Sequence, residues 1–242
     1  MIPLPPSAEV LPDAEAVAAA AAKRLLALCR SAARHDIAVC LAGGSTPKRL
    51  YARLSGPDYR EQLPWERLHW FFGDDRLVPW TDAASNVRMA RDAFGDAPIP
   101  EGHLHGMATD GSPEAGARAY AETLRAFYGA ADLDPARPLF DLVLLGLGED
   151  GHTASLFPAK PALAERTAWT APVPEAGLAP FVPRITLTFP ALASARETLF
   201  LVTGAGKQEP LRRLARGEDL PARHVRSVGR LVWLVDRDAA GA

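Results

Sequence analysis

Short apolar segments that alternate with amphipathic ones restrict the fold of this chain more than any other feature of its sequence. The segments LVLLGL (residues 142–147) and TLFLV (residues 198–202) are almost wholly apolar. Such runs are typical of strands buried on both faces, as in parallel sheets that helices cover. Stretches with apolar residues at helical spacing separate them. We therefore predict an α/β fold: a doubly wound, mainly parallel sheet with helices on both faces.

The order of the predicted elements supports this arrangement. Asp13, Ser112 and either Ser85 or Asn86 are placed to cap helices, as is Ser45 or Thr46. No internal repeat, low-complexity tract or long linker divides the sequence, so residues 1–242 are expected to form a single domain. Helices are predicted over residues 13–34, 45–54, 85–94, 112–128 and 207–216. Strands are predicted over residues 37–44, 142–147, 168–173, 184–189, 197–204 and 230–236, and residues 68–76 are predicted to be a strand followed by a tight loop.

The composition argues against several classes of function. The formal net charge is −2 and charges of both signs are intermixed, so we expect neither a nucleic acid nor a membrane as partner. The N-terminal segment lacks a basic start and charged residues interrupt its alanine run, which argues against a signal peptide and a membrane span. Cys29 and Cys40 form no metal-binding pair and suit a reducing compartment. We expect a small-molecule ligand and a cytoplasmic location.

Four polar clusters follow predicted strands: residues 43–46, 73–76, 148–155 and 204–207. In doubly wound sheets the ligand lies beyond the carboxyl ends of the strands, where these clusters are expected. The first contains Gly43, Gly44, Ser45 and Thr46, which let a backbone and a helix N-terminus approach an anion. Its pattern does not match the P-loop of nucleotide-binding proteins, the glycine motif of dinucleotide-binding proteins or the nucleophile elbow of hydrolases. It is predicted to be a ligand-binding loop, with a plain capped turn as the alternative.

Cationic and acidic side chains occur in two of the other clusters. Asp74 is placed to bind sugar hydroxyls or to act as a base, and the planar guanidinium of Arg76 suits a phosphate. The alternative is a surface turn with an exposed ion pair. Lys207 stands at a predicted helix start, where a cation is unfavourable unless an anion is near. It is therefore predicted to contact a phosphate or a carboxylate, with a solvated lysine as the alternative.

His152 is the strongest candidate for catalysis. It follows a buried strand through a glycine-rich loop, and Asp150 is close enough in sequence to orient its ring. A neutral imidazole is well suited to removing a proton near neutral pH. The stretch 153–156 is expected to begin a short helix whose amide groups face the same space.

The remaining candidates have structural interpretations. His103 and His105 alternate on one short strand and would face the same way, yet no third metal ligand is evident near them. We predict a structural role for both. Asp141, at the start of its strand, is likewise expected to be a structural partner, and no metal site is predicted.

Five motifs in this order resemble the 6-phosphogluconolactonase family of the pentose phosphate pathway: LAGGSTPKRLY, FFGDDRLVPWTDAASNVRMARDAF, LGLGEDGHTASLFP, RITLTFPAL and VTGAGKQEPL. The resemblance implies the fold of glucosamine-6-phosphate isomerase, a modified Rossmann fold, and metal-free hydrolysis of 6-phosphoglucono-1,5-lactone without a cofactor. The related isomerases carry a glutamate at the position of Phe157, and its absence favours the lactonase. Asp75 departs from the family, which commonly has glutamate there.

For this reaction we hypothesise the following roles for the site residues. His152 would activate water as a general base and protonate the leaving ring oxygen, with Asp150 orienting it. Backbone amides near Gly44 and Ser45, or after Gly151, would stabilise the oxyanion. The substrate, a sugar phosphate lactone, would be bound by Gly43, Gly44, Ser45, Thr46, Asp74, Arg76, Gly151, Ser155, Arg184 and Lys207. A monomer or weak homodimer is expected. Two alternatives remain: an amino-sugar-phosphate isomerase or deaminase, and a sugar-phosphate sensor without catalysis.

Overall fold

The computed structural model describes residues 2–242, and its centre is a seven-stranded sheet. The strands run in the order β1-β10-β9-β6-β2-β3-β5, and every neighbouring pair is parallel. This arrangement confirms the predicted mainly parallel α/β sheet. The strands are β1 (Ala8–Leu11), β2 (Ile37–Leu41), β3 (Leu68–Phe72), β5 (Leu104–His105), β6 (Phe140–Leu145), β9 (Ala195–Val202) and β10 (Arg230–Asp236).

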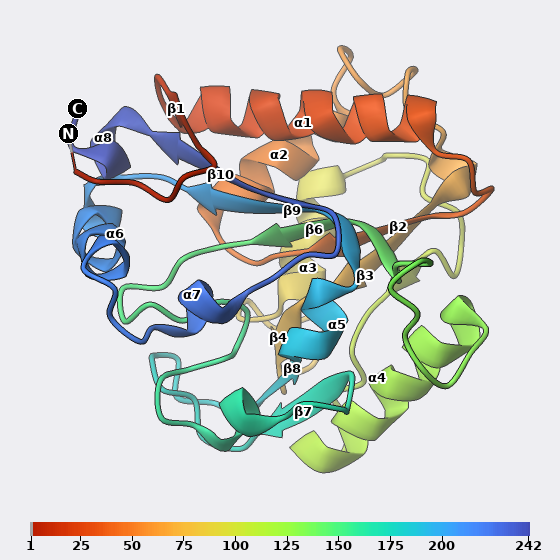
Figure 1. Cartoon of the computed structure of the whole chain (residues 1–242). Helices are drawn as coiled ribbons and strands as arrows, with labels where there is room; N and C mark the ends of the chain where they lie inside the picture. The colour runs from red at the N-terminus through yellow and green to blue at the C-terminus, as the bar shows by residue number, and fades with distance from the viewer. Residues whose placement is uncertain (1) are drawn as a thin grey trace.

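Helices cover both faces of this sheet. In Figure 1, α1 and α2 lie above the large sheet, and α4 and α5 lie below it. The doubly wound arrangement follows from the crossover connections between parallel strands. The helices are α1 (Ala14–Ser31), α2 (Ser45–Ser55), α3 (Asn86–Phe94), α4 (Pro113–Tyr128), α5 (Phe189–Ala193), α6 (Gln208–Ala215), α7 (Pro221–His224) and α8 (Arg237–Ala240). Short 3₁₀ turns are η1 (Trp65–Arg67), η2 (Pro161–Ala164) and η3 (Ala205–Lys207).

A second, antiparallel sheet was not predicted. It contains β4 (Asp74–Arg76), β7 (Thr170–Val173) and β8 (Arg184–Leu187) in the order β4-β8-β7. Gly73 joins the two sheets, because its amide donates to the Leu41 carbonyl (2.9 Å) and its carbonyl accepts from the Leu187 amide (2.7 Å). Asp74 and Arg76 therefore lie on a strand of their own, and not in a surface turn.

Side-chain capping explains where three of the longer helices begin. Asp13, Ser85 and Ser112 each accept a backbone N–H bond at the start of α1, α3 and α4, as predicted. The prediction for α2 is wrong: Gly44 occupies its N-cap position, with φ of 105° and no side-chain cap. Only glycine adopts that backbone conformation readily.

The buried apolar side chains form one contiguous cluster around the large sheet. Cys29 and Cys40 belong to it as free thiols, and burial raises the pKa of both. Among residues 2–242 no helix combines the length and the apolar character that crossing a membrane requires.

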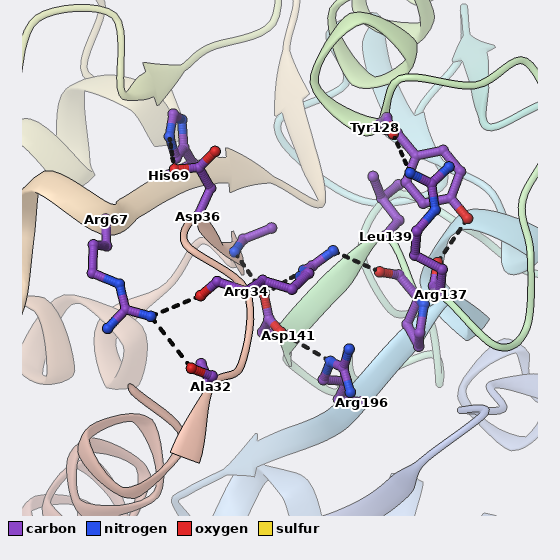
Figure 2. A network of polar contacts seen from close by, with 12 residues as sticks. Ala32, Arg34, Asp36, Arg67, His69, Tyr128, Arg137, Leu139, Asp141 and Arg196 are labelled. Atoms are coloured by element: carbon purple, nitrogen blue, oxygen red, sulfur yellow. Dashed lines mark hydrogen bonds and ion pairs between the residues drawn. The ribbon is translucent and has the colours of Figure 1, made fainter. Parts of the chain in front are cut away.

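An ionic network ties the amino ends of β2 and β6 together (Figure 2). The Asp141 carboxylate, with a side chain only 2% exposed, accepts from Arg34 Nη2 (2.5 Å) and from the Ala38 amide (2.9 Å) and pairs with Arg196 (3.1 Å). Arg34 also donates to the Pro138 carbonyl. This network lies at the opposite edge of the sheet from the carboxyl ends of the strands, so the structural role predicted for Asp141 is confirmed.

Replacing Asp141 with asparagine should destabilise the fold strongly. The change removes the charge that balances two arginines at a buried position, and breaking such a pair typically costs about 3 kcal/mol. The measurement is the free energy of unfolding in guanidinium chloride. Glu122→Gln is the matched control, since its carboxylate pairs with Arg125 on the exposed face of α4 and should change stability by about 0.5 kcal/mol or less. Equal effects of the two substitutions would contradict this account.

Candidate active site

A cavity of about 510 Å³ opens at the carboxyl ends of β2, β3, β6 and β9. This is where ligands bind in doubly wound sheets. The structure brings most of the predicted site residues together in its wall: Gly43, Gly44, Ser45, Thr46, Asp74, Arg76, His152, Arg184 and Lys207.

Two predicted contact residues do not line this cavity. Ser155 is completely buried, and its hydroxyl donates to Asp74 Oδ2 at 2.5 Å while its amide donates to Thr186. Gly151 is buried as well, and a Cβ there would lie 2.8 Å from the Leu220 side chain. The predicted substrate contacts of Ser155 and Gly151 are therefore corrected: Ser155 fixes the Asp74 carboxylate from behind, and Gly151 allows the chain to pack on Leu220.

His152 lies in the cavity wall in a fixed orientation. Its Nδ1 is 2.6 Å from Asp150 Oδ1, and the same oxygen accepts the His152 amide at 3.0 Å. The ring also packs at a tilt on Phe157, with centroids 4.5 Å apart. Because the carboxylate oxygen accepts from Nδ1–H, the neutral ring carries its lone pair on Nε2. Within residues 2–242 that nitrogen has no hydrogen-bond partner, so it is available to a ligand.

The Asp150 carboxyl is ionised at neutral pH in this arrangement. Partial burial alone would raise its pKa, but the hydrogen bonds from the His152 ring and amide outweigh burial, and the pKa lies below its usual value. An ionised carboxylate at Nδ1 stabilises the imidazolium that forms when Nε2 takes a proton. The pair therefore has the features of a general base and its orienting acid.

The segment after His152 is a turn, and the helix predicted there does not form. Thr153 and Leu156 pair through an isolated bridge, and Ala154 between them has φ of 47°. A left-handed conformation is uncommon for alanine and is often associated with functional sites. Ala154 lines the cavity, but no helix N-terminus exists here to present amides.

The start of α2 does reach the cavity. Gly44, Ser45 and Thr46 line the cavity, and the first amides of a helix have no partner within the helix. Thr46 is held by a 2.6 Å hydrogen bond between its hydroxyl and that of Thr203. The positive end of an 11-residue helix thus faces the same space as His152.

Two arginines face each other across the small sheet. Arg76 and Arg184 are direct cross-strand partners on β4 and β8, an unfavourable position for like charges. The Nε atoms of both are buried and have no hydrogen-bond partner among residues 2–242. Lys207 also lines the cavity, and it makes no ion pair within the part of the chain that the structure describes. The cavity thus brings three cationic side chains together, with Asp74 and Glu149 also in its wall. The two guanidinium groups keep Nε donors that no described residue satisfies, and such donors suit an anion as ligand.

Arg184 is the most enclosed of these cations, with 4% of its surface exposed. Burial lowers its pKa, and Asp74 and Arg76 act on it in opposite directions. Its Nη2 donates to the carbonyls of Leu178 and Pro180, both at 3.1 Å, and its guanidinium lies over the Phe157 ring at 5.1 Å. Arg184 therefore contacts both the loop that contains Leu178 and Pro180 and the Phe157 ring beside His152.

Sequence reasoning missed several residues of the cavity wall. Asn86 was considered only as a possible helix cap, yet it lines the cavity while Ser85 makes the cap. Thr203 directly follows β9 and precedes the predicted cluster by one residue, so the position of the strand end was its available signal. Leu178 and Ala179 reach the cavity from an irregular loop, for which the sequence gives no signal.

Three histidines gather away from the cavity, beside β3 and β5. His69 stacks on His103 with centroids 3.9 Å apart, and its Nδ1 is 3.0 Å from Nε2 of His105. Burial, with the neighbouring imidazoles, lowers the pKa of His105 to about 4. Across residues 2–242 no group of three or more His, Cys, Asp or Glu side chains has the geometry to hold a metal ion. The role of the three rings in the structure is packing.

Comparison with known proteins places this architecture in a family. A sequence model described as "Glucosamine-6-phosphate isomerases/6-phosphogluconolactonase" matches residues 12–233. The 6-phosphogluconolactonase of Synechocystis sp. is 42% identical over 208 residues, which cover 83% of this chain and 82% of that protein. That of Mycobacterium tuberculosis is 39% identical, with 97% of each chain covered.

Solved structures agree with the sequence comparison. The 6-phosphogluconolactonase from Trypanosoma cruzi is 29% identical and superposes with a TM-score of 0.86, covering 100% of this chain and 97% of that chain. The match thus includes the parallel sheet, the small antiparallel sheet and the loops that form the cavity. The chain belongs to the glucosamine-6-phosphate isomerase and 6-phosphogluconolactonase family.

Proposed function

We propose that this chain hydrolyses 6-phospho-D-glucono-1,5-lactone to 6-phospho-D-gluconate. The observation that carries the proposal is a single cavity with an oriented imidazole in one part of its wall and three cationic side chains elsewhere in it. A sugar lactone with a distant phosphate matches both features, because its anion is bound by cations while its ring reaches the base. The relatives named 6-phosphogluconolactonase support this choice.

The proposed reaction uses His152 twice. Nε2 takes a proton from water as the water oxygen bonds to the lactone C1. The bond from C1 to the ring oxygen then breaks, and the imidazolium returns the proton to that oxygen. Amides at the start of α2 donate to the oxyanion that forms at C1. In other enzymes one such donor stabilises the transition state by about 3 kcal/mol. No step requires a metal ion or a cofactor.

Phe157 distinguishes this reaction from the isomerase chemistry of the same family. The relevant isomerase motif has a glutamate at that position, whereas Phe157 is fully buried against His152 and Arg184. An aromatic ring cannot transfer the proton that ring opening of an amino sugar requires. We therefore do not propose isomerase or deaminase activity. The free cysteines suit the reducing cytoplasm, where we place the reaction, with the protein acting as a monomer or weak homodimer.

The proposal is tested by the rate at which freshly prepared lactone disappears in a pH-stat. Protein should accelerate the reaction well above spontaneous hydrolysis, and a chelator should leave the rate unchanged. Ammonia release from glucosamine 6-phosphate serves as the control for the isomerase alternative and should not be detected. Tight binding of 6-phosphogluconate without acceleration would instead identify a sensor, and loss of activity with the chelator would refute the metal-free mechanism.

Lys207→Ala should raise the KM for the phosphorylated lactone about tenfold and change kcat little. The ammonium group contacts the phosphate in both the ground state and the transition state, and loss of such uniform binding appears in KM. Steady-state kinetics provide the measurement. Lys160→Ala is the control, because Lys160 pairs with the exposed Glu175. An unchanged KM in Lys207→Ala would remove this residue from the phosphate site.

A further inference from the structure

Asn86 makes an unusual set of contacts for the first residue of a helix. It is 3% exposed, and its Nδ2 donates to the Asp74 carbonyl (2.9 Å) and more weakly to Asp74 Oδ1 (3.4 Å). Its Oδ1 accepts from Arg76 Nη1 at 2.9 Å. The orientation of the amide is fixed by its partners, because a guanidinium only donates and a carbonyl only accepts.

The backbone of Asn86 is held equally firmly. Its amide donates to Asp75 Oδ1 at 2.7 Å, and the other oxygen of Asp75 accepts from the Ser85 hydroxyl at 3.1 Å. Asp75 is 1% exposed, and burial raises its pKa to about 6 although several backbone amides act in the opposite direction. Asp75 is thus an anchor for the start of α3, and the side chain of Asn86 cannot shift without disturbing it.

Asn86 also supports the loop that leads into α2. A Cβ placed on Gly43 would lie 2.3 Å from Asn86 Oδ1, so the amide occupies the space beside that glycine. On its other side, Asp74 accepts from Ser155 in the segment that follows His152. The neutral side chain of Asn86 therefore contacts Arg76 and the loop at Gly43. Through Asp74 it is also linked to the segment that carries His152.

The neutrality of Asn86 matters because of Arg76. Among residues 2–242, the only acceptors for the Arg76 guanidinium are Asn86 Oδ1 and the Ala84 carbonyl at 2.8 Å, and neither carries a charge. A carboxylate at position 86 would orient Arg76 and also neutralise it. Without an acceptor at position 86, only the Ala84 carbonyl would hold the Arg76 guanidinium against repulsion from Arg184 across the strands.

We infer that Asn86 is a positioning residue for the phosphate of the substrate: it orients Arg76 while leaving its positive charge free. This inference rests on the proposed function, which supplies the phosphate. Asn86 acts through Arg76, so its removal should weaken phosphate binding and leave the chemistry at His152 nearly intact.

The test combines Asn86→Ala with Asn86→Asp, which keeps the size and an oxygen for Arg76. Both should raise KM for the lactone and Kd for 6-phosphogluconate about tenfold, with kcat falling less than about threefold. In an Arg76→Ala background, Asn86→Ala should cause no further loss. Binding of gluconate, which lacks the phosphate, should be the same in all variants. Arg88→Ala on α3 is the control, since among residues 2–242 the Arg88 side chain contacts the Thr81 carbonyl and Asp92 and no residue of the cavity wall.

Isothermal titration of each variant with inorganic phosphate measures anion binding without any turnover. It therefore tests this inference independently of the proposed function. If the wild-type protein binds phosphate but does not accelerate lactone hydrolysis, the proposed function fails, and the Asn86 variants still decide the inference. Wild-type phosphate affinity in Asn86→Asp would overturn the argument from neutrality. Additive losses in the Arg76→Ala background, or equal losses for gluconate, would show a general structural role and overturn the inference. Asn86→Asp keeps the test valid should the alanine variant fail to fold.

Discussion

Replacing His152 with alanine should reduce kcat for the lactone by a factor of about 10² to 10⁴, the usual contribution of a general base. The affinity for 6-phosphogluconate should change less than about threefold, because the imidazole is oriented by Asp150 and Phe157 and the anion is bound by other residues. The measurements are pH-stat rates, corrected for spontaneous hydrolysis, and calorimetric titration of the product.

Two further variants make this result specific. His35→Ala removes an exposed histidine whose side chain is 81% accessible, and it should behave as the wild type. Asp150→Asn keeps a hydrogen-bond acceptor for Nδ1–H but removes the negative charge beside the ring. We therefore expect kcat to fall clearly, although less than in His152→Ala. Lactone hydrolysis at the wild-type rate in His152→Ala would exclude the imidazole as the base.

The main architecture could be predicted because it depends on local patterns. The strand over 230–236 is found at the predicted bounds, and Asp13 and Ser112 cap the helices that the sequence assigned to them. Continuous apolar runs, helical periodicity and capping side chains each act within a few residues. The position of the cavity then followed from a general rule for parallel sheets.

The small sheet could not be predicted in the same way. Strands β4 and β8 are far apart in sequence, and their antiparallel pairing makes Arg76 and Arg184 cross-strand neighbours. Sequence reasoning assigned both arginines to the phosphate site but had no means of finding that they are cross-strand neighbours.

Residues that act through other residues were the hardest to find. Ser155 was expected to touch the substrate because it is polar and close to His152, yet its hydroxyl lies behind the wall on Asp74. Asn86 was considered only for capping, yet its amide joins Arg76 to Asp74. Composition and spacing identify a side chain that is chemically suited to a ligand, but the direction in which it points is set by tertiary packing.

Gly148→Ala should inactivate the enzyme almost as completely as the loss of His152 itself. A Cβ at this position would lie 2.0 Å from His152 Nδ1 and 2.2 Å from its Cε1, so the imidazole must leave its place. The backbone cannot easily move to relieve the clash, because the Gly148 amide donates to the His152 carbonyl at 2.8 Å. Displacement would break the bond to Asp150, and kcat should fall by a factor of about 10² or more.

The same loop provides the control for this steric argument. A Cβ at Gly146 would meet no atom within 4 Å, so Gly146→Ala should lower kcat far less. NMR of the imidazole nitrogens should show that the Nδ1–H of His152 loses its hydrogen bond in Gly148→Ala and keeps it in Gly146→Ala. If Gly148→Ala retained both that hydrogen bond and full turnover, the imidazole would not lie against this glycine. The orientation of the ring, on which the proposed chemistry depends, would then be wrong.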